Sequence, residues 1–224
     1  MTDSELIDHT ISFVKNSLKG AEGGHDWFHT HRVLLNAQRI AKTEQVDELV
    51  VSLGALLHDI ADAKFNDGDE TVGPRIAKEF LLSKHTDANM VDHVVKIIEH
   101  ISFKSTLKSG KHVSIETKFS SKELKVVQDA DRLDAIGAIG IARAFNYGGF
   151  KNRELYDPEI KPNLKMTKEQ YKKSKTPTIN HFYEKLLLLK GLMNTETGKK
   201  LAEERHQFML VYLERFYNEW NGMA

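Results

Sequence analysis

Side chains that ligate divalent metals are concentrated in three short runs of the sequence. The first run surrounds His29, the second is the doublet His58-Asp59, and the third surrounds Asp131. Imidazole nitrogens and carboxylate oxygens together suit divalent cations of borderline hardness. The chain has no cysteine, which excludes disulfides, thiolate ligands and thiolate nucleophiles. The pattern therefore predicts a metal site with mixed nitrogen and oxygen ligands.

Two of these runs belong to helical patterns that are otherwise apolar. Leu53, Leu56 and Leu57 precede the doublet, and Asp131 lies in a helical pattern with one apolar face. Burying an unpaired imidazole or carboxylate is strongly unfavourable, and a divalent cation would satisfy both groups together. A single buried histidine is more often hydrogen-bonded within a core. The coincidence of three runs in one chain is what favours a metal.

Apolar residues recur with helical spacing along most of the chain, so we expect an all-α fold. A capping box of Ser120 and Glu123 is expected to open one of the helices, and Pro74 suits a first helical turn. Alternation over 112–116 fits either a short strand or an irregular loop, of which the loop is favoured. The expected helices cover about 6–18, 33–41, 49–57, 76–81, 91–101, 120–144, 178–192 and 195–220.

A length of 224 residues fits one compact domain. We expect a core at about 25–145, a long loop or lid at about 146–177, and C-terminal helices at about 178–220. The lid segment holds three of the four prolines, and residues 151–175 carry eight Lys or Arg against four acids. A loop of this length is often functional, so it could close over a phosphate substrate. A solvated insertion is the alternative.

The charges balance, with 32 Lys plus Arg against 32 Asp plus Glu. A neutral sum argues against a general binder of nucleic-acid polymers or membrane surfaces, which usually carries a basic excess. No apolar stretch approaches the roughly 20 residues of a membrane span, and the N-terminus lacks the pattern of a signal peptide. We therefore expect a cytoplasmic protein that acts on a small molecule.

The three runs around His29, His58-Asp59 and Asp131 together resemble the HD-domain metal-dependent phosphohydrolases. The similarity covers most of the chain and is least close at 105–119. It is strongest to the small bacterial branch with nucleotide pyrophosphohydrolase activity. The resemblance implies an all-helical HD-type fold, and it implies that the metal ligands are His29, His58, Asp59 and Asp131. The runs that carry it are His29-x-x-Arg32-Val33, Gly-His-Asp-Trp at 24–27, Leu-His-Asp-Ile at 57–60, Gln-Asp-Ala-Asp-Arg-Leu-Asp-Ala at 128–135 and Gly-Ile-Ala-Arg at 140–143.

Two imidazoles and two carboxylates leave open positions on a six-coordinate ion for water and a phosphate oxygen. We expect Mn²⁺ first, with Fe²⁺, Co²⁺, Ni²⁺, Zn²⁺ or Mg²⁺ as alternatives, rather than Ca²⁺. The resemblance implies hydrolysis of a (deoxy)nucleoside triphosphate to monophosphate and pyrophosphate through a metal-activated water. A homodimer is compatible with the sequence.

Three other functions are weighed against this one. A nucleotide phosphomonoesterase, like a 5'-nucleotidase, would use the same metal site on a different substrate. A nucleotide-sensing HD domain would bind without turnover, but all four ligand positions are filled here. A zincin-like peptidase is suggested by His25 and His29, spaced four residues apart with Asp26 between them. Asp26 is one methylene shorter than the glutamate base of that motif, and the preceding glycines put His25 at a helix start rather than inside a helix.

Further polar residues near the ligands are candidates for supporting roles, although each could also be an ordinary surface charge. Candidates for general acid or base work, or for orienting a ligand, are His25, Asp26, Asp62, Glu70 and His100. Candidates for binding substrate phosphates are Arg32, Lys64, Lys104, Arg132 and His181.

Overall fold

The computed structural model describes residues 1–21, 24–61, 69, 71–101, 107–108, 111–112, 119–166, 170 and 174–223. The chain divides into two compact units, each described here by itself. Unit 1 is Met1–Thr106 with Ser114–Asp131, and unit 2 is Leu107–Val113 with Arg132–Ala224. The division of residues 1–224 into core, lid and C-terminal helices stays a prediction.

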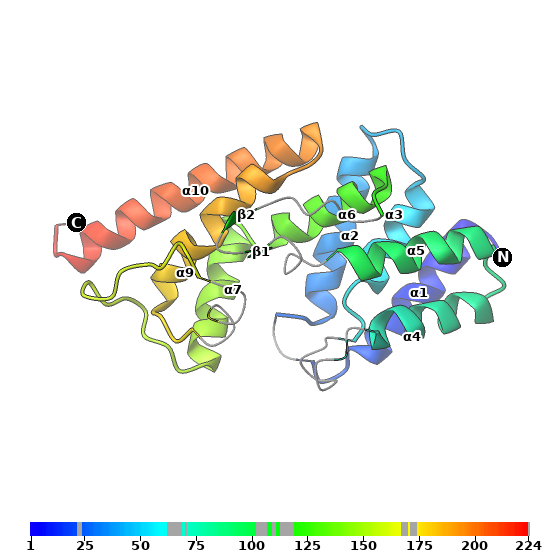
Figure 1. Cartoon of the computed structure of the whole chain (residues 1–224), viewed down its shortest axis with the longest axis horizontal. Helices are drawn as coiled ribbons and strands as arrows, with labels where there is room; N and C mark the ends of the chain where they lie inside the picture. Colours follow the sequence, from blue (N-terminus) through cyan, green and yellow to red (C-terminus); the bar gives the residue numbers. More distant parts are fainter. Residues whose placement is uncertain are drawn as a thin grey trace. The chain divides into compact units, whose positions relative to one another are not determined.

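Unit 1 is built around α3 (Glu48–Leu57), whose residues from Val50 to Leu57 are all buried. Helices α1, α2 and α5 pack against it (Figure 1). Gly54 lets α3 approach its neighbours, since a Cβ there would lie 3.1 Å from Ile97. The other helices of the unit are α1 (Asp3–Ser17), α2 (Trp27–Ala41), α4 (Val72–Ser83), α5 (Ala88–His100) and residues 122–131 of α6 (Lys122–Asp134).

Aspartates begin three of these helices. The side chains of Asp26, Asp47 and Asp87 accept hydrogen bonds from backbone N–H groups in the first turns of α2, α3 and α5. Such caps satisfy amides that have no partner within the helix. Pro74 lies in the first turn of α4, as predicted. The five helices predicted between residues 6 and 101 are therefore confirmed as α1 to α5.

The single helix expected over 120–144 is wrong, because the structure has two helices there. The cap of α6 is Ser121, whose Oγ accepts from the N–H of Leu124 at 3.0 Å, so the predicted Ser120–Glu123 capping box is also wrong. Helix α6 ends at Asp134 and α7 (Gly137–Phe150) follows. Gly137 has φ +77°, a left-handed conformation that glycine adopts readily.

Unit 2 contains α7, α9 (Thr178–Glu184), a 3₁₀ helix (Leu186–Leu192) and α10 (Glu196–Trp220). The expected helix over 178–192 is thus an α-helix followed by a 3₁₀ helix. A two-residue antiparallel pair joins β1 (Leu107–Lys108) to β2 (Lys111–His112). Residues 113–116 of the expected short strand lie outside the described part. Apart from this pair, the described fold is helical, which confirms the predicted all-α class.

The described part of the predicted lid is hydrogen-bonded to α9. The N–H groups of Thr178 and Ile179 donate to the carbonyls of residues 154 and 155 at 2.9 and 3.0 Å. Asn180 donates to the carbonyl of Ile160 at 2.9 Å, and the N–H of Asn163 donates to Glu184 at 3.1 Å. Residues 154–163 are therefore held within unit 2, and a lid function for the segment stays a prediction.

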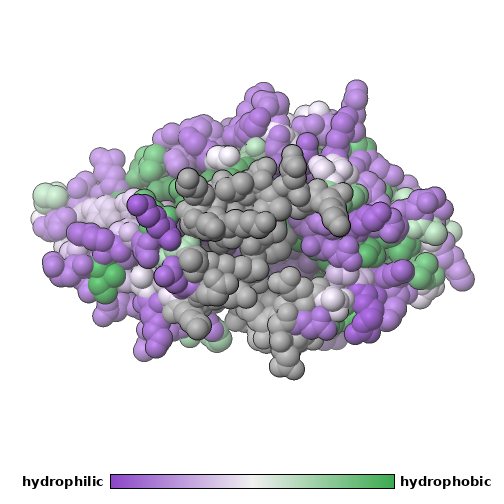
Figure 2. All heavy atoms as spheres, in the orientation of Figure 1, coloured by the Kyte–Doolittle hydropathy of each residue, from purple (hydrophilic) through white to green (hydrophobic). Residues whose placement is uncertain are grey.

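The surface of the described residues is mainly hydrophilic in the view of Figure 2, with scattered apolar side chains. This agrees with a chain in which 29% of the residues are charged. Among the described residues, no helix has both the length and the apolar character that crossing a membrane requires.

Candidate metal centre

Three helices of unit 1 bring His29, His58 and Asp131 together. His29 lies in the first turn of α2, His58 follows the last residue of α3, and Asp131 lies near the end of α6. The Nε2 atoms of the two histidines are 3.3 Å apart, and they lie 3.6 and 3.8 Å from Oδ1 of Asp131. Ligands around a tetrahedral ion with bonds of about 2.1 Å are separated by roughly 3.4 Å. The three atoms therefore fit a metal ion.

The cluster is buried on one side and open on the other. The side chains of His29 and His58 are 3% and 5% exposed, whereas that of Asp131 is 35% exposed. Helix α6 is held near α5 by Gln128, whose side-chain amide donates to the carbonyl of His100 at 3.1 Å. Asp131 is therefore the most accessible of the three side chains.

A backbone carbonyl fixes the ring of His58. Its Nδ1 is 2.8 Å from the carbonyl oxygen of Ala55, so Nδ1 carries the proton and donates. In the neutral ring, Nε2 then holds a lone pair directed at the cluster. The last carbonyls of an α-helix have no partner within it, so a histidine just past α3 can be oriented in this way. Ala55 was missed in the sequence, although a histidine at a helix end is the signal that could have pointed to it.

Asp26 positions His29 through the backbone. Its Oδ1 accepts from the N–H of His29 at 2.9 Å, which is the cap of α2. The sequence suggested that Asp26 could orient a ligand, and the contact made here is with the main chain rather than the imidazole. Asp26 therefore fixes the helical turn from which His29 projects.

Asp59, the fourth predicted ligand, is paired with His25. Its Oδ2 lies 2.5 Å from His25 Nδ1. Burial raises the pKa of Asp59, but the hydrogen bond and the charge of His25, with further contributions from His58 and His29, outweigh it and lower the pKa to about 2. Asp59 is therefore a carboxylate at neutral pH. Among the described residues, the compact group of ligand atoms is that of His29, His58 and Asp131 and does not include Asp59, so its role as the fourth ligand stays a prediction.

The structure gives the remaining candidates different surroundings. Arg32 lies on α2, one turn after His29, and is partly exposed. His100 ends α5, and its Nδ1 is 2.8 Å from the carbonyl of Lys96. Asp62, Lys64, Glu70 and Lys104 lie outside the described residues.

Two candidates belong to unit 2 and gain no support as phosphate-binding cations. Arg132 is 8% exposed, and its Nη1 donates to the carbonyl of Leu192 at 2.6 Å. Burial, with the nearby charges of Lys185 and Arg153, lowers the pKa of His181 to about 3. His181 is therefore neutral at physiological pH and offers only an uncharged imidazole.

The zincin arrangement is not formed. Helix α2 begins at Trp27, so His25 precedes the helix that carries His29. The two rings are 6.0 Å apart between centroids, and His25 contacts Asp59 while His29 contacts His58. A peptidase helix with two histidine ligands one turn apart is therefore excluded.

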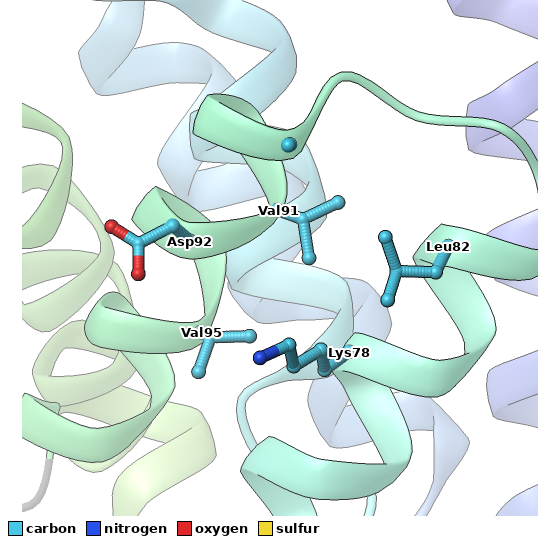
Figure 3. A pocket seen from close by; sticks show the side chains of 6 residues that line it. Lys78, Leu82, Val91, Asp92 and Val95 are labelled. Carbon is cyan, nitrogen blue, oxygen red and sulfur yellow. The ribbon is translucent and has the colours of Figure 1, made fainter.

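A cavity of about 180 Å³ lies between α4 and α5. Figure 3 shows Lys78, Leu82, Val91, Asp92 and Val95 around it. The remaining lining residue is an alanine, so the lining is mainly aliphatic, and it contains none of the candidate site residues. The metal-ligand cluster of unit 1 is therefore a separate feature from this cavity.

Comparison with known proteins identifies the family. The HD domain model matches residues 27–136, a range that contains all four predicted ligands. The uncharacterized protein YpgQ of Bacillus subtilis is 38% identical over 226 residues, which is 100% of this chain and 98% of that protein. The crystal structure of an HD-superfamily hydrolase from Bacillus thuringiensis is 40% identical, with a TM-score of 0.76, and the match covers 98% and 99% of the two chains. The structure of B. subtilis YpgQ in complex with ADP is 35% identical, also with a TM-score of 0.76, and the match covers 98% and 97%.

The chain therefore belongs to the HD-domain superfamily of hydrolases. Its enzyme class is that of the metal-dependent phosphohydrolases, as the motifs predicted. The His29, His58 and Asp131 cluster is the part of this chain in which a divalent metal would be held.

Proposed function

We propose that this enzyme hydrolyses nucleoside or deoxynucleoside triphosphates to the monophosphate and pyrophosphate. Water supplies the new oxygen on the α-phosphorus, and the bond from that phosphorus to the bridging oxygen breaks. The observation that carries the proposal is the convergence of His29, His58 and Asp131, whose ligand atoms all lie within 4.8 Å of one another. The relative YpgQ, with ADP in its structure, supports a nucleotide as the substrate.

The four side chains fit a divalent cation of borderline hardness, and Mn²⁺ is the proposed metal. His29, His58, Asp59 and Asp131 would hold it. When bound, such an ion polarises a phosphoryl group and lowers the pKa of a water molecule. The chain's own contribution is orientation: Ala55 fixes the ring of His58, and Asp26 fixes the turn that carries His29.

Substrate phosphates need cations, and we assign this role to Arg32, Lys64 and Lys104. Arg32 lies one turn from His29 on α2. The surplus of positive charge at 151–175 would add long-range attraction for a polyphosphate. The charge balance of the whole chain supports a small nucleotide rather than a nucleic-acid polymer as the substrate. A cytoplasmic location is part of the proposal.

A panel of nucleotides with added Mn²⁺ tests the proposal. Phosphate and pyrophosphate are measured separately for mono-, di- and triphosphates, with Asp59→Ala as the control. We expect pyrophosphate from triphosphates with wild type and almost none with Asp59→Ala. Phosphate released from monophosphates alone would replace the proposal with a phosphomonoesterase. Full activity of Asp59→Ala would refute the metal site.

A further inference from the structure

The contact between His25 and Asp59 defines which atom carries which proton. An aspartate carboxyl group ordinarily carries no proton at neutral pH, so it can only accept hydrogen bonds. The 2.5 Å contact therefore requires His25 Nδ1 to be the donor and Asp59 Oδ2 to be the acceptor. Oδ2 of Asp59 therefore accepts a hydrogen bond from His25.

The position of His25 makes this contact specific. It lies outside α2, which begins at Trp27, and it is 34 residues from Asp59 in sequence. Asp59 follows His58 directly, so its backbone is already placed by the end of α3. The side chains of His25 and Asp59 are 31% and 17% exposed, which shields the pair in part from competing water.

We propose that His25 is a positioning residue that restricts Asp59 to one metal-binding oxygen. This inference rests on the proposed metal site. A free carboxylate can bind a cation through both oxygens. In Asp59, the hydrogen bond from His25 occupies one lone pair of Oδ2 and holds that oxygen beside the imidazole, which favours Oδ1 as the ligand. Each oxygen withheld from the ion leaves one coordination position for water. His25 thereby helps to set how many water molecules the bound ion retains.

Titration of the purified protein with Mn²⁺ tests this inference. Calorimetry gives the affinity, and water-proton relaxation gives the number of water molecules on the bound ion. We expect His25→Ala to weaken Mn²⁺ binding by about 10–100-fold, as is typical when a residue that orients a ligand is lost. We also expect one water fewer on the ion, because Asp59 can then bind through both oxygens.

His25→Asn provides a conservative variant, since its amide nitrogen lies at nearly the same distance along the side chain as Nδ1. We expect it to restore both the affinity and the water number. His25→Gln places its nitrogen one bond further away and should resemble His25→Ala. The comparison of His25→Asn with His25→Gln keeps the test valid even if the alanine variant does not fold. His31→Ala is the matched control, because His31 is a nearby histidine on α2 whose ring stacks on Trp27.

The outcomes separate this inference from the proposed function. If wild type does not bind Mn²⁺, the metal site itself is wrong and the role of His25 is wrong with it. If wild type binds but His25→Ala keeps the wild-type affinity or water number, only the inference is overturned. It is also overturned if Asn and Gln at this position behave alike, or if every substitution abolishes binding as Asp59→Ala does, because His25 would then be a ligand.

Discussion

Two carboxylates of α6, one in each unit, have different kinds of partner. In unit 2, Asp134 is 1% exposed and forms an ion pair with Arg143. In unit 1, Asp131 faces the ring nitrogens of His29 and His58 at 3.6 and 3.8 Å. A carboxylate paired with an arginine is satisfied within the fold. Lone pairs and carboxylate oxygens that converge on one point favour a cation supplied from outside.

The arginines of unit 2 extend this contrast. Arg143 also donates to the carbonyl of Asp134 at 3.2 Å, and Arg205 donates to the carbonyl of Leu133. These contacts satisfy carbonyls at the end of α6 that have no partner within the helix. The two carboxylates on α6 are three residues apart, so they provide a matched pair for separating catalysis from stability.

Asp131→Asn should have the largest effect on activity. The substitution keeps the shape of the side chain but removes a negative ligand, so Mn²⁺-dependent hydrolysis should fall by about 1000-fold, which is roughly 4 kcal/mol. In EDTA, the free energy of unfolding should stay within about 1 kcal/mol of wild type, because the side chain is a third exposed. Steady-state kinetics and urea unfolding measure the two quantities. A large loss of stability with retained activity would reverse the assigned roles.

Asp134→Asn should show the opposite pattern. Removing one charge of a buried pair usually destabilises by 3–5 kcal/mol, and we expect about 3 kcal/mol here because the Arg143 side chain is 24% exposed. Urea unfolding in EDTA checks this value. Mn²⁺ affinity, measured where the variant remains folded, should match wild type. If affinity falls as far as in Asp131→Asn, the two carboxylates do not have separate functions.

Adding Mn²⁺ should stabilise unit 1 in particular. At a metal concentration of 100 times Kd, binding to the folded state alone contributes about 2.7 kcal/mol. Hydrogen exchange should slow in α2, in α3 and in residues 122–131, with little change in α9 and α10. Asp131→Asn should lose the effect. Equal protection of both units would show that metal binding is not confined to the unit that holds the cluster.

The smallest expected effect is on the pH dependence of the free energy of unfolding, to which His181 in unit 2 contributes. Its folded-state pKa of about 3 lies below the ordinary value of 6.5, so the unfolded chain binds more protons between these values. The stabilisation is therefore complete above pH 6.5 and is lost as the pH falls, by at most about 1.4 kcal/mol per pH unit. Urea unfolding of His181→Gln at pH 7 and 5 should show a weaker pH dependence than wild type. An unchanged slope would mean that His181 titrates normally in the folded chain.

The ligand cluster was predictable because ionisable side chains occur within apolar helical patterns, where burying them without a partner is unfavourable. His58 and Asp131 interrupt apolar helical faces, and that conflict is visible in the sequence. The pairing of His25 with Asp59 was not predictable, because it joins side chains 34 residues apart and depends on the path of the chain before α2.

The break between α6 and α7 was missed for a different reason. Apolar spacing continues through Ile136 and Ile139, so the pattern indicates one helix. The structure gives Ile136 an extended conformation and Gly137 a positive φ. A Cβ on Gly140 would lie 2.3 Å from the carbonyl oxygen of Ala135, so the close turn requires glycine. Backbone contacts of this kind leave no periodic signal in the sequence.

The three-residue spacing between Gln128 and Asp131 also limits how this protein can evolve. Each residue of an α-helix turns the chain by about 100°. One residue inserted between the two side chains would change their angular relation by that amount, so Gln128 could no longer reach the carbonyl of His100 while Asp131 faces the two histidines. A substitution in this part of α6 removes one of these contacts, whereas a change in length breaks the relation between them. Related enzymes that keep both contacts should therefore vary in length elsewhere.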